Sequence, residues 1–141
     1  MNLLKSGLNK DFYKWVDDVK KAIRHKKELE DKLEYFESRL TGYQAVVYDS
    51  IGSSSSRNNV EDNLLYVIGK IDAVNDQMKE VRMRINEYIV FKSKLSGKTN
   101  LLLEYLIESN LQQSIISLNL NLSKSRFYQI VNELSRKYDS I

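Results

Sequence analysis

The 141-residue sequence has no cysteine and no proline, and it has only five glycines. The absence of cysteine excludes disulfides, thiolate nucleophiles and cysteine-ligated metal sites, and it is compatible with the cytoplasmic location that we expect. Because proline and glycine are the strongest helix breakers, their scarcity leaves room for long helices. With 42% hydrophobic and 29% charged residues, the composition is typical of a soluble, helix-rich protein.

Long apolar runs are also missing. No stretch approaches the ~20 apolar residues that span a bilayer, and residues 1–10 lack the apolar run of a signal peptide, so we expect no membrane partner. The formal net charge of +3 gives weak support for nucleic acid as a partner. Residues 100–141 contain four basic and four acidic side chains. A neutral module of this size is expected to bind DNA well only as two copies or with a partner protein.

The sequence also lacks a recognisable catalytic constellation. His25 is the only histidine, and it lies in the basic run over residues 20–27. A metal site or a Ser-His-Asp arrangement needs partners at defined geometry, and the spacing indicates none. We therefore expect no enzymatic activity, no metal and no cofactor. The basic run itself is more simply a solvated helix face with acidic residues nearby.

Two long segments are present in which apolar residues alternate at spacings of four and three. This spacing predicts a helix with one narrow apolar seam, which requires a partner helix. In residues 12–47, Lys26 interrupts the seam, and Phe12 and Val16 widen the apolar stripe at its start. The seam of this segment consists of Trp15, Val19, Ala22, Lys26, Leu29, Leu33, Phe36, Leu40, Tyr43 and Val47. The seam of residues 61–95 consists of Leu64, Val67, Ile71, Val74, Met78, Val81, Ile85, Tyr88, Lys92 and Leu95.

The segment between these two helices is polar and rich in serine. It has no periodicity, so we expect a flexible loop over residues 50–60. A loop this short favours an antiparallel hairpin. The alternative is that each helix pairs with its copy in another chain, and both arrangements together give a four-helix bundle from a dimer.

The second long helix is predicted to end at residues 96–98, with Gly97 in the C-terminal position that glycine favours. Thr99 or Asn100 is then expected to cap a shorter helix over residues 101–109. We therefore divide the chain near Gly97 into a coiled-coil hairpin, residues 1–97, and a C-terminal domain, residues 98–141. The inward face of the shorter helix is formed by Leu102, Leu103, Leu106 and Ile107.

The last segment, residues 110–138, has the apolar spacing of a helix-turn-helix. Ser117 is small where the two helices cross closest, and Asn121 stands where the turn calls for a left-handed residue. Ser123 is a good N-cap for the second helix, because its hydroxyl can accept a hydrogen bond from an amide in the first turn. The residues expected to face inward are Ile116, Leu120, Leu122, Phe127 and Ile130.

The outward face of the second helix is the part that indicates chemistry, because this motif lays one helix in the major groove of DNA. Glutamine and asparagine can pair with adenine, serine can bond to several base edges, and lysine and arginine can hold phosphates. A plain helical hairpin with its polar side toward water has the same pattern, so both interpretations stay open. The outward residues are Lys124, Ser125, Tyr128, Gln129, Asn132, Arg136 and Lys137.

The layout of the chain resembles the phage and prophage late-gene activators of the ArpU/RinA type from Gram-positive bacteria. Their C-terminal part is similar to region 4 of sigma factors. The order of a coiled-coil pair, a Ser-rich loop and a helix-turn-helix carries the resemblance over roughly residues 10–138. Motif-level detail is confined to residues 101–138, where residues 125–130 read Ser-Arg-Phe-Tyr-Gln-Ile and are followed by Leu134, Arg136 and Lys137.

This resemblance implies a DNA-binding regulator that turns on phage late genes, with RNA polymerase as a further partner. Carried over by position, it implies two sets of site residues on this chain. The set facing the bases is Lys124, Ser125, Tyr128, Gln129 and Asn132. The set facing the phosphates is Ser123, Arg126, Arg136 and Lys137.

The sequence therefore predicts an all-α fold, in which a long antiparallel helical hairpin precedes a small C-terminal helix-turn-helix domain. The leading functional hypothesis is a transcription regulator that binds promoter DNA as a dimer and acts on RNA polymerase. The alternative is a structural protein of phage assembly, such as a small terminase subunit, because such proteins also combine helix-turn-helix units with coiled coils.

Overall fold

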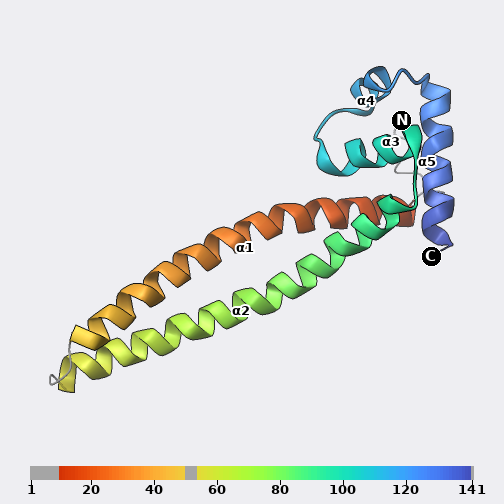
Figure 1. The fold of residues 1–141 in the computed structure, drawn as a ribbon. Coiled ribbons are helices and arrows are strands. Elements are labelled where there is room, and N and C mark those ends of the chain that lie inside the picture. Colours follow the sequence, from red (N-terminus) through yellow and green to blue (C-terminus); the bar gives the residue numbers. More distant parts are fainter. Residues whose placement is uncertain (1–9, 50–53, 141) are drawn as a thin grey trace. The chain divides into compact units, whose positions relative to one another are not determined.

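The computed structural model describes residues 10–49 and 54–140, and within these ranges it contains five α-helices and no strand. The helices α1 (Lys10–Asp49) and α2 (Ser54–Ser93) have 40 residues each. They are followed by α3 (Gly97–Glu108), α4 (Gln113–Asn119) and α5 (Lys124–Asp139). The predicted all-α fold with a long helical hairpin is confirmed, and Figure 1 shows α1 and α2 running antiparallel.

The packing of α1 against α2 follows the two predicted seams. Every seam residue whose side chain is described is buried or half-buried, whereas most of the residues between them are exposed. Leu29 and Val67 are fully buried, and Tyr66, next to Val67, is 56% exposed. The seams therefore close within one chain. The side chain of Val47, the last predicted seam residue of α1, lies outside the described residues.

The boundary predicted at the start of the second helix is wrong. The helix α2 begins at Ser54, so it includes most of the segment that was expected to be a loop over residues 50–60. Residues 50–53 lie outside the described residues. Extending an existing helix adds one backbone hydrogen bond for each residue that is fixed, whereas only the first turn is unfavourable to form. A helix that is stabilised by the seam from Leu64 onward can therefore extend back through polar residues of modest helix propensity.

The helix ends predicted around Gly97 are also wrong. The helix α2 ends at Ser93, and Gly97 is the first residue of α3, which follows Ser96 in an extended conformation. Gly97 does have a left-handed φ of 61°, so this position needs glycine, but at the start of a helix instead of the end of one. Thr99 and Asn100 lie inside α3 and do not cap it.

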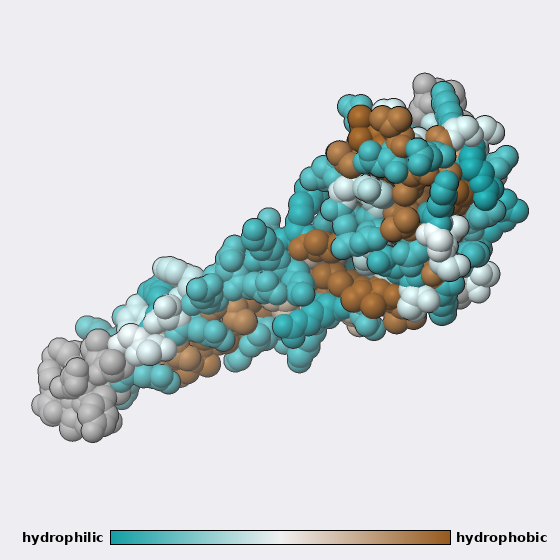
Figure 2. Space-filling view, turned by 45° about the horizontal axis from the view of Figure 1, so that its top comes forward, coloured by the Kyte–Doolittle hydropathy of each residue, from teal (hydrophilic) through white to brown (hydrophobic). Residues whose placement is uncertain are grey.

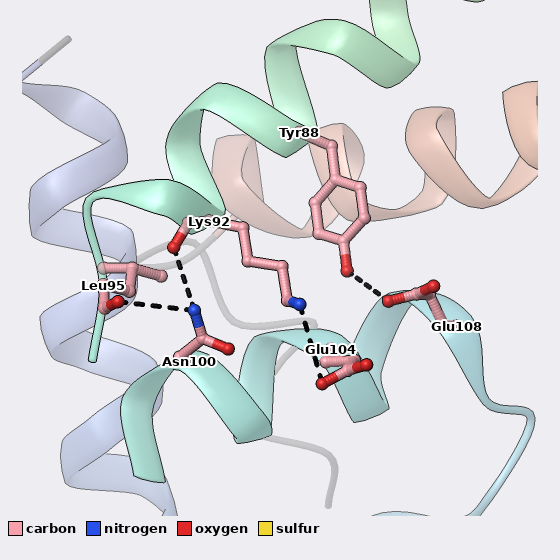
Figure 3. A network of polar contacts seen from close by, with 6 residues as sticks. All are labelled: Tyr88, Lys92, Leu95, Asn100, Glu104 and Glu108. Carbon is pink, nitrogen blue, oxygen red and sulfur yellow. Dashed lines mark hydrogen bonds and ion pairs between the residues drawn. The ribbon is translucent and has the colours of Figure 1, made fainter. Parts of the chain in front are cut away.

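Asn100 instead closes the C-terminal end of α2 (Figure 3). Its side-chain Nδ2 donates to the carbonyl oxygen of Lys92 at 2.9 Å and to that of Leu95 at 3.3 Å. A helix leaves its last carbonyl groups without partners, and a side-chain amide from the next helix satisfies them here. Asn100 therefore fixes α3 to the end of α2.

Two further side-chain contacts join α2 and α3 (Figure 3). The hydroxyl of Tyr88 donates to Glu108 Oε2 at 2.6 Å, and Lys92 Nζ lies 3.6 Å from Glu104 Oε2. Burial, together with the hydrogen bond to Glu108, raises the pKa of Tyr88 well above its usual value. The Tyr88 hydroxyl therefore stays a proton donor over the whole physiological pH range.

The chain forms two compact units, each defined by the contacts among its own residues. Among the described residues, one unit lies within Arg24–Met83, and the other joins residues 10–23 with residues 84–140. In this second unit, which we call the composite unit, the start of α1 and the end of α2 share one hydrophobic core with the three short helices. The helices α1 and α2 contribute Phe12, Trp15, Val16, Val19, Tyr88 and Phe91, and the chain beyond α2 contributes Leu95, Leu102, Leu103, Leu106, Ile107, Ile116, Leu120, Phe127, Ile130, Val131 and Leu134.

The core of the composite unit therefore runs across Gly97, the position at which the sequence predicted a domain boundary. All four inward residues predicted for α3 are confirmed as buried, namely Leu102, Leu103, Leu106 and Ile107. The helix α5 packs against both α3 and α4. The sequence thus identified the faces of the short helices correctly, and the structure shows what covers them.

We expect Asn100→Ala to lower the free energy of unfolding by about 1–2 kcal/mol, because the carbonyl oxygens of Lys92 and Leu95 both lose the hydrogen bond from Asn100. Thermal unfolding followed by circular dichroism measures the change. The control is Asn110→Ala, which removes an exposed asparagine between α3 and α4. Equal melting temperatures for the two variants would show that the Asn100 contacts do not stabilise the fold.

Candidate nucleic-acid interface

The turn between α4 and α5 has the conformation that the sequence predicted for a helix-turn-helix. Asn121 has a φ of 55°, in the left-handed region. Its amide donates to the carbonyl oxygen of Leu118 at 3.2 Å, and the amide of Leu122 donates to that of Ser117 at 2.8 Å. The chain therefore leaves α4 through a tight, hydrogen-bonded turn before α5 begins.

The start of α5 is capped as predicted. The Ser123 hydroxyl accepts a hydrogen bond from the backbone amide of Arg126 at 3.1 Å. This bond satisfies one of the amides that the first turn of a helix leaves unpaired. The predicted inward residues are confirmed as well, since Leu122 is half-buried against the core and the others, Ile116, Leu120, Phe127 and Ile130, are buried.

Most of the predicted site residues lie on one polar side of α5. The buried side of the helix consists of Phe127, Ile130, Val131, Leu134 and Ser135. Tyr128 and Asn132 are half-buried, and the exposed members of the predicted site are Ser123, Lys124, Ser125, Arg126, Gln129, Arg136 and Lys137. The structure therefore brings the predicted residues together at the surface of one helix.

The two arginines on this polar side are oriented by bonds within α5. Arg126 Nη1 donates to Gln129 Oε1 at 3.2 Å, and Arg136 Nε donates to the carbonyl oxygen of Asn132 at 3.4 Å. A guanidinium carries further N–H donors beyond the one used in each bond. Both arginines therefore keep donors for an anionic ligand, and the Gln129 carboxamide keeps its NH₂ group as a donor.

Tyr128 differs from the other predicted base-facing residues. Its ring packs against the core and makes an edge contact with Phe127, with 5.5 Å between the ring centroids. Its hydroxyl donates to Gln113 Oε1 of α4 at 3.4 Å. Tyr128 therefore connects α4 to α5 and lies at the border between the polar side of α5 and the core.

Sequence reasoning missed the contribution of α1 to this region. A groove of about 590 Å³ separates the start of α1 from the segment that leads into α4. Four lysines of α1 line it, Lys10, Lys14, Lys20 and Lys21, and Leu111 and Gln113 line it from the other side. The one signal in the sequence was the widening of the apolar stripe at Phe12 and Val16, because both residues are buried in the composite core.

Gln113 connects this groove to a second one. The second groove, of about 440 Å³, lies between α4 and α5 and is lined by Gln113, Ser114, Ser117, Lys124, Phe127 and Tyr128. The first groove also contains Tyr13, whose buried hydroxyl has no hydrogen-bond partner within the described residues. Burial, with smaller contributions from Tyr128 and Asp17, raises the pKa of Tyr13, so this hydroxyl stays neutral.

The outer side of α4 presents apolar side chains to the surface. Ile115 and Leu118 are exposed, Leu118 by 72%, and their spacing of three places them on one side of α4. Leu111, just before this helix, is exposed as well. On the face drawn in Figure 2, brown apolar side chains reach the surface among teal polar ones. Exposed apolar stripes are typical of protein contacts, whereas phosphates require polar or charged partners.

Within residues 10–49 and 54–140, no group of three His, Asp or Glu side chains is placed to hold a metal ion. None of the helices in these ranges is long and apolar enough to cross a membrane. The chemistry that the described site offers is therefore hydrogen bonding and positive charge, supplied mainly by α5 and the start of α1.

We expect Asn121→Val to lower the free energy of unfolding by about 1–3 kcal/mol, because a β-branched residue is strained in the left-handed region. Asn121→Gly is the matched control, since glycine adopts this conformation without strain and should unfold close to the wild type. Urea unfolding of both variants measures the difference. An equal loss in both would assign the role to the asparagine side chain and not to the backbone conformation.

No protein-family model, curated protein or solved structure matches this chain.

Proposed function

We propose that this chain binds double-stranded DNA through α4 and α5, with α5 in the major groove. The observation that carries the proposal is that a capped helix, which follows a tight turn with a left-handed Asn121, presents one stripe of hydrogen-bonding side chains on its polar side. Ser125, Gln129, Asn132 and Arg136 follow one another at spacings of four, three and four along α5. Such spacing places them on one side of the helix, and their side chains match the donors and acceptors of base edges.

Positive charge beside this stripe supports the proposal. From Ser123 to Tyr138 the chain has four basic residues and one acidic residue, Glu133. Lys124 and Arg126 are exposed at the start of α5, and Lys137 is exposed near its end. Basic residues on both ends of the stripe suit the two phosphate backbones that border a groove.

We further propose that the protein is a phage-type transcription regulator that acts on RNA polymerase in the host cytoplasm and binds DNA as a dimer. The resemblance to late-gene activators supports this part of the proposal. Exposed apolar residues on α2, such as Leu65 and Met83, and the apolar stripe on α4 supply surfaces for protein partners. A dimer doubles the number of phosphate contacts that one small module can make.

We expect Lys124→Ala combined with Gln129→Ala to abolish sequence-specific DNA binding while helicity and oligomeric size stay unchanged. Both side chains are exposed and neither fills the core, so the fold does not depend on them. The matched control is Lys27→Ala combined with Gln44→Ala, which removes the same two residue types from exposed positions of α1. Specific binding that survives in the first variant would contradict the assignment of α5 as the recognition helix.

A gel-shift assay tests the proposal, using DNA fragments that tile the genome around the gene and two salt concentrations. A discrete, salt-sensitive shift on one fragment supports a sequence-specific regulator, because bound phosphates release counterions. An absence of any shift at low salt, with protein of confirmed fold and size, would overturn it. That result would favour the alternative of a phage assembly protein, because association through apolar helix seams is largely insensitive to salt.

A further inference from the structure

The start of α1 carries a row of lysines on its exposed side. Lys10, Lys14 and Lys21 are exposed and are separated by four and seven residues, so they share one stripe of the helix. Over eleven residues the row extends about 16 Å along the helix axis. On the opposite side of the same turns, Phe12, Val16 and other apolar residues are buried in the composite core.

The lysines of these turns outnumber the carboxylates beside them. Asp17 and Asp18 line the same groove as the four lysines, and Asp11 lines a neighbouring groove with Lys14 and Asp18. Among the described residues, no ion pair joins any of these three carboxylates to one of the lysines. Four ammonium groups against three carboxylates leave this part of the surface positive, with the lysines available to an anionic ligand.

The row is connected to the proposed DNA-binding helices through shared grooves. Lys10, Lys14 and Lys21 line the groove that contains Gln113, and Gln113 also lines the groove that contains Lys124 and Tyr128. Tyr128 in turn is bonded to Gln113, and both Tyr128 and Tyr13 of α1 pack against the composite core. The start of α1 and the start of α5 therefore belong to one continuous surface of the composite unit.

We propose that the start of α1 is a second phosphate-binding surface, and that it contacts the DNA backbone beside the groove that α5 reads. The inference rests on the proposed function and extends it to residues outside the helix-turn-helix. The lysines of α1 also change the net charge of the binding module. Residues 100–141 are neutral alone, but the folded unit adds the lysines of α1 to the basic residues of α5. Lysine is suited to this role, because an ammonium group binds phosphate without reading the base sequence.

The test is the salt dependence of binding to a mixed-sequence DNA duplex, since phosphate contacts are independent of sequence. The variant is Lys10→Gln, Lys14→Gln and Lys21→Gln in the full chain. The logarithm of the binding constant falls with the logarithm of the salt concentration, and each lost phosphate contact makes this slope less steep by about 0.9. We therefore expect the magnitude of the slope to decrease by about two to three in this variant. Lys14→Gln alone should decrease the magnitude of the slope by about one. This single variant replaces the triple variant if the triple variant does not fold.

The matched control is Lys27→Gln, Lys32→Gln and Lys79→Gln, which removes the same charge from exposed positions of the unit Arg24–Met83. We expect its slope to equal that of the wild type. A slope that falls as much in the control as in the α1 variant would overturn the inference, because net charge alone would then explain the effect.

Failure of this inference is distinguishable from failure of the proposed function. If the wild type binds and Lys124→Gln reduces the slope while the α1 variant does not, DNA binding by α5 stands and the role of α1 is wrong. If the wild type shows no binding at low salt, the proposed function is overturned and the inference falls with it.

Discussion

The packing of Trp15 is the contact on which the rest of the composite unit depends. Its ring lies 5.4 Å from that of Phe91 in α2 and 5.2 Å from that of Tyr138 in α5, and both Trp15 and Phe91 are buried. Phe12, one turn earlier in α1, lies 6.2 Å from the same Tyr138 ring. One aromatic cluster therefore joins the first helix, the second helix and the last helix of the chain, and large aromatic side chains bury more area than any others.

This cluster explains why the C-terminal helices need the two long ones. The helices α4 and α5 have 7 and 16 residues, and helices this short are marginal without tertiary packing. The aromatic cluster anchors the C-terminal end of α5, while the turn at Asn121 and the cap at Ser123 position its N-terminal end. Asn100 and Tyr88 attach α3, against which α5 also packs. The polar stripe of α5 is thus held at both ends by contacts in which its own side chains take no part.

Local features of the structure could be predicted from the sequence, and contacts between distant segments could not. The seams, the left-handed Asn121 and the Ser123 cap each follow from the chemistry of a few neighbouring residues. The heptad pattern assigned Trp15 and Val19 to a two-helix seam, but periodicity tells only which side of a helix is buried and not what buries it. Phe12 and Val16 carried the information that more than one partner was present. Gly97 was recognised as a special position, but its left-handed conformation lies at the start of α3 instead of the end of α2. The end of α2 is closed by Asn100, a contact from the next helix that periodicity does not reveal.

The same distinction applies to the candidate site. The residues of α5 could be named from the sequence because an exposed helical face is a local property, whereas the half-burial of Tyr128 depends on Gln113 of α4 and on the core beneath it. Recognition of a base edge requires side chains held to within a fraction of their own length, which loops achieve less well than anchored helices. The proposed function assigns two tasks to one helix. The buried side of α5 packs on the composite core, and the opposite side carries the polar stripe, so substitutions in the stripe leave the fold that presents it intact.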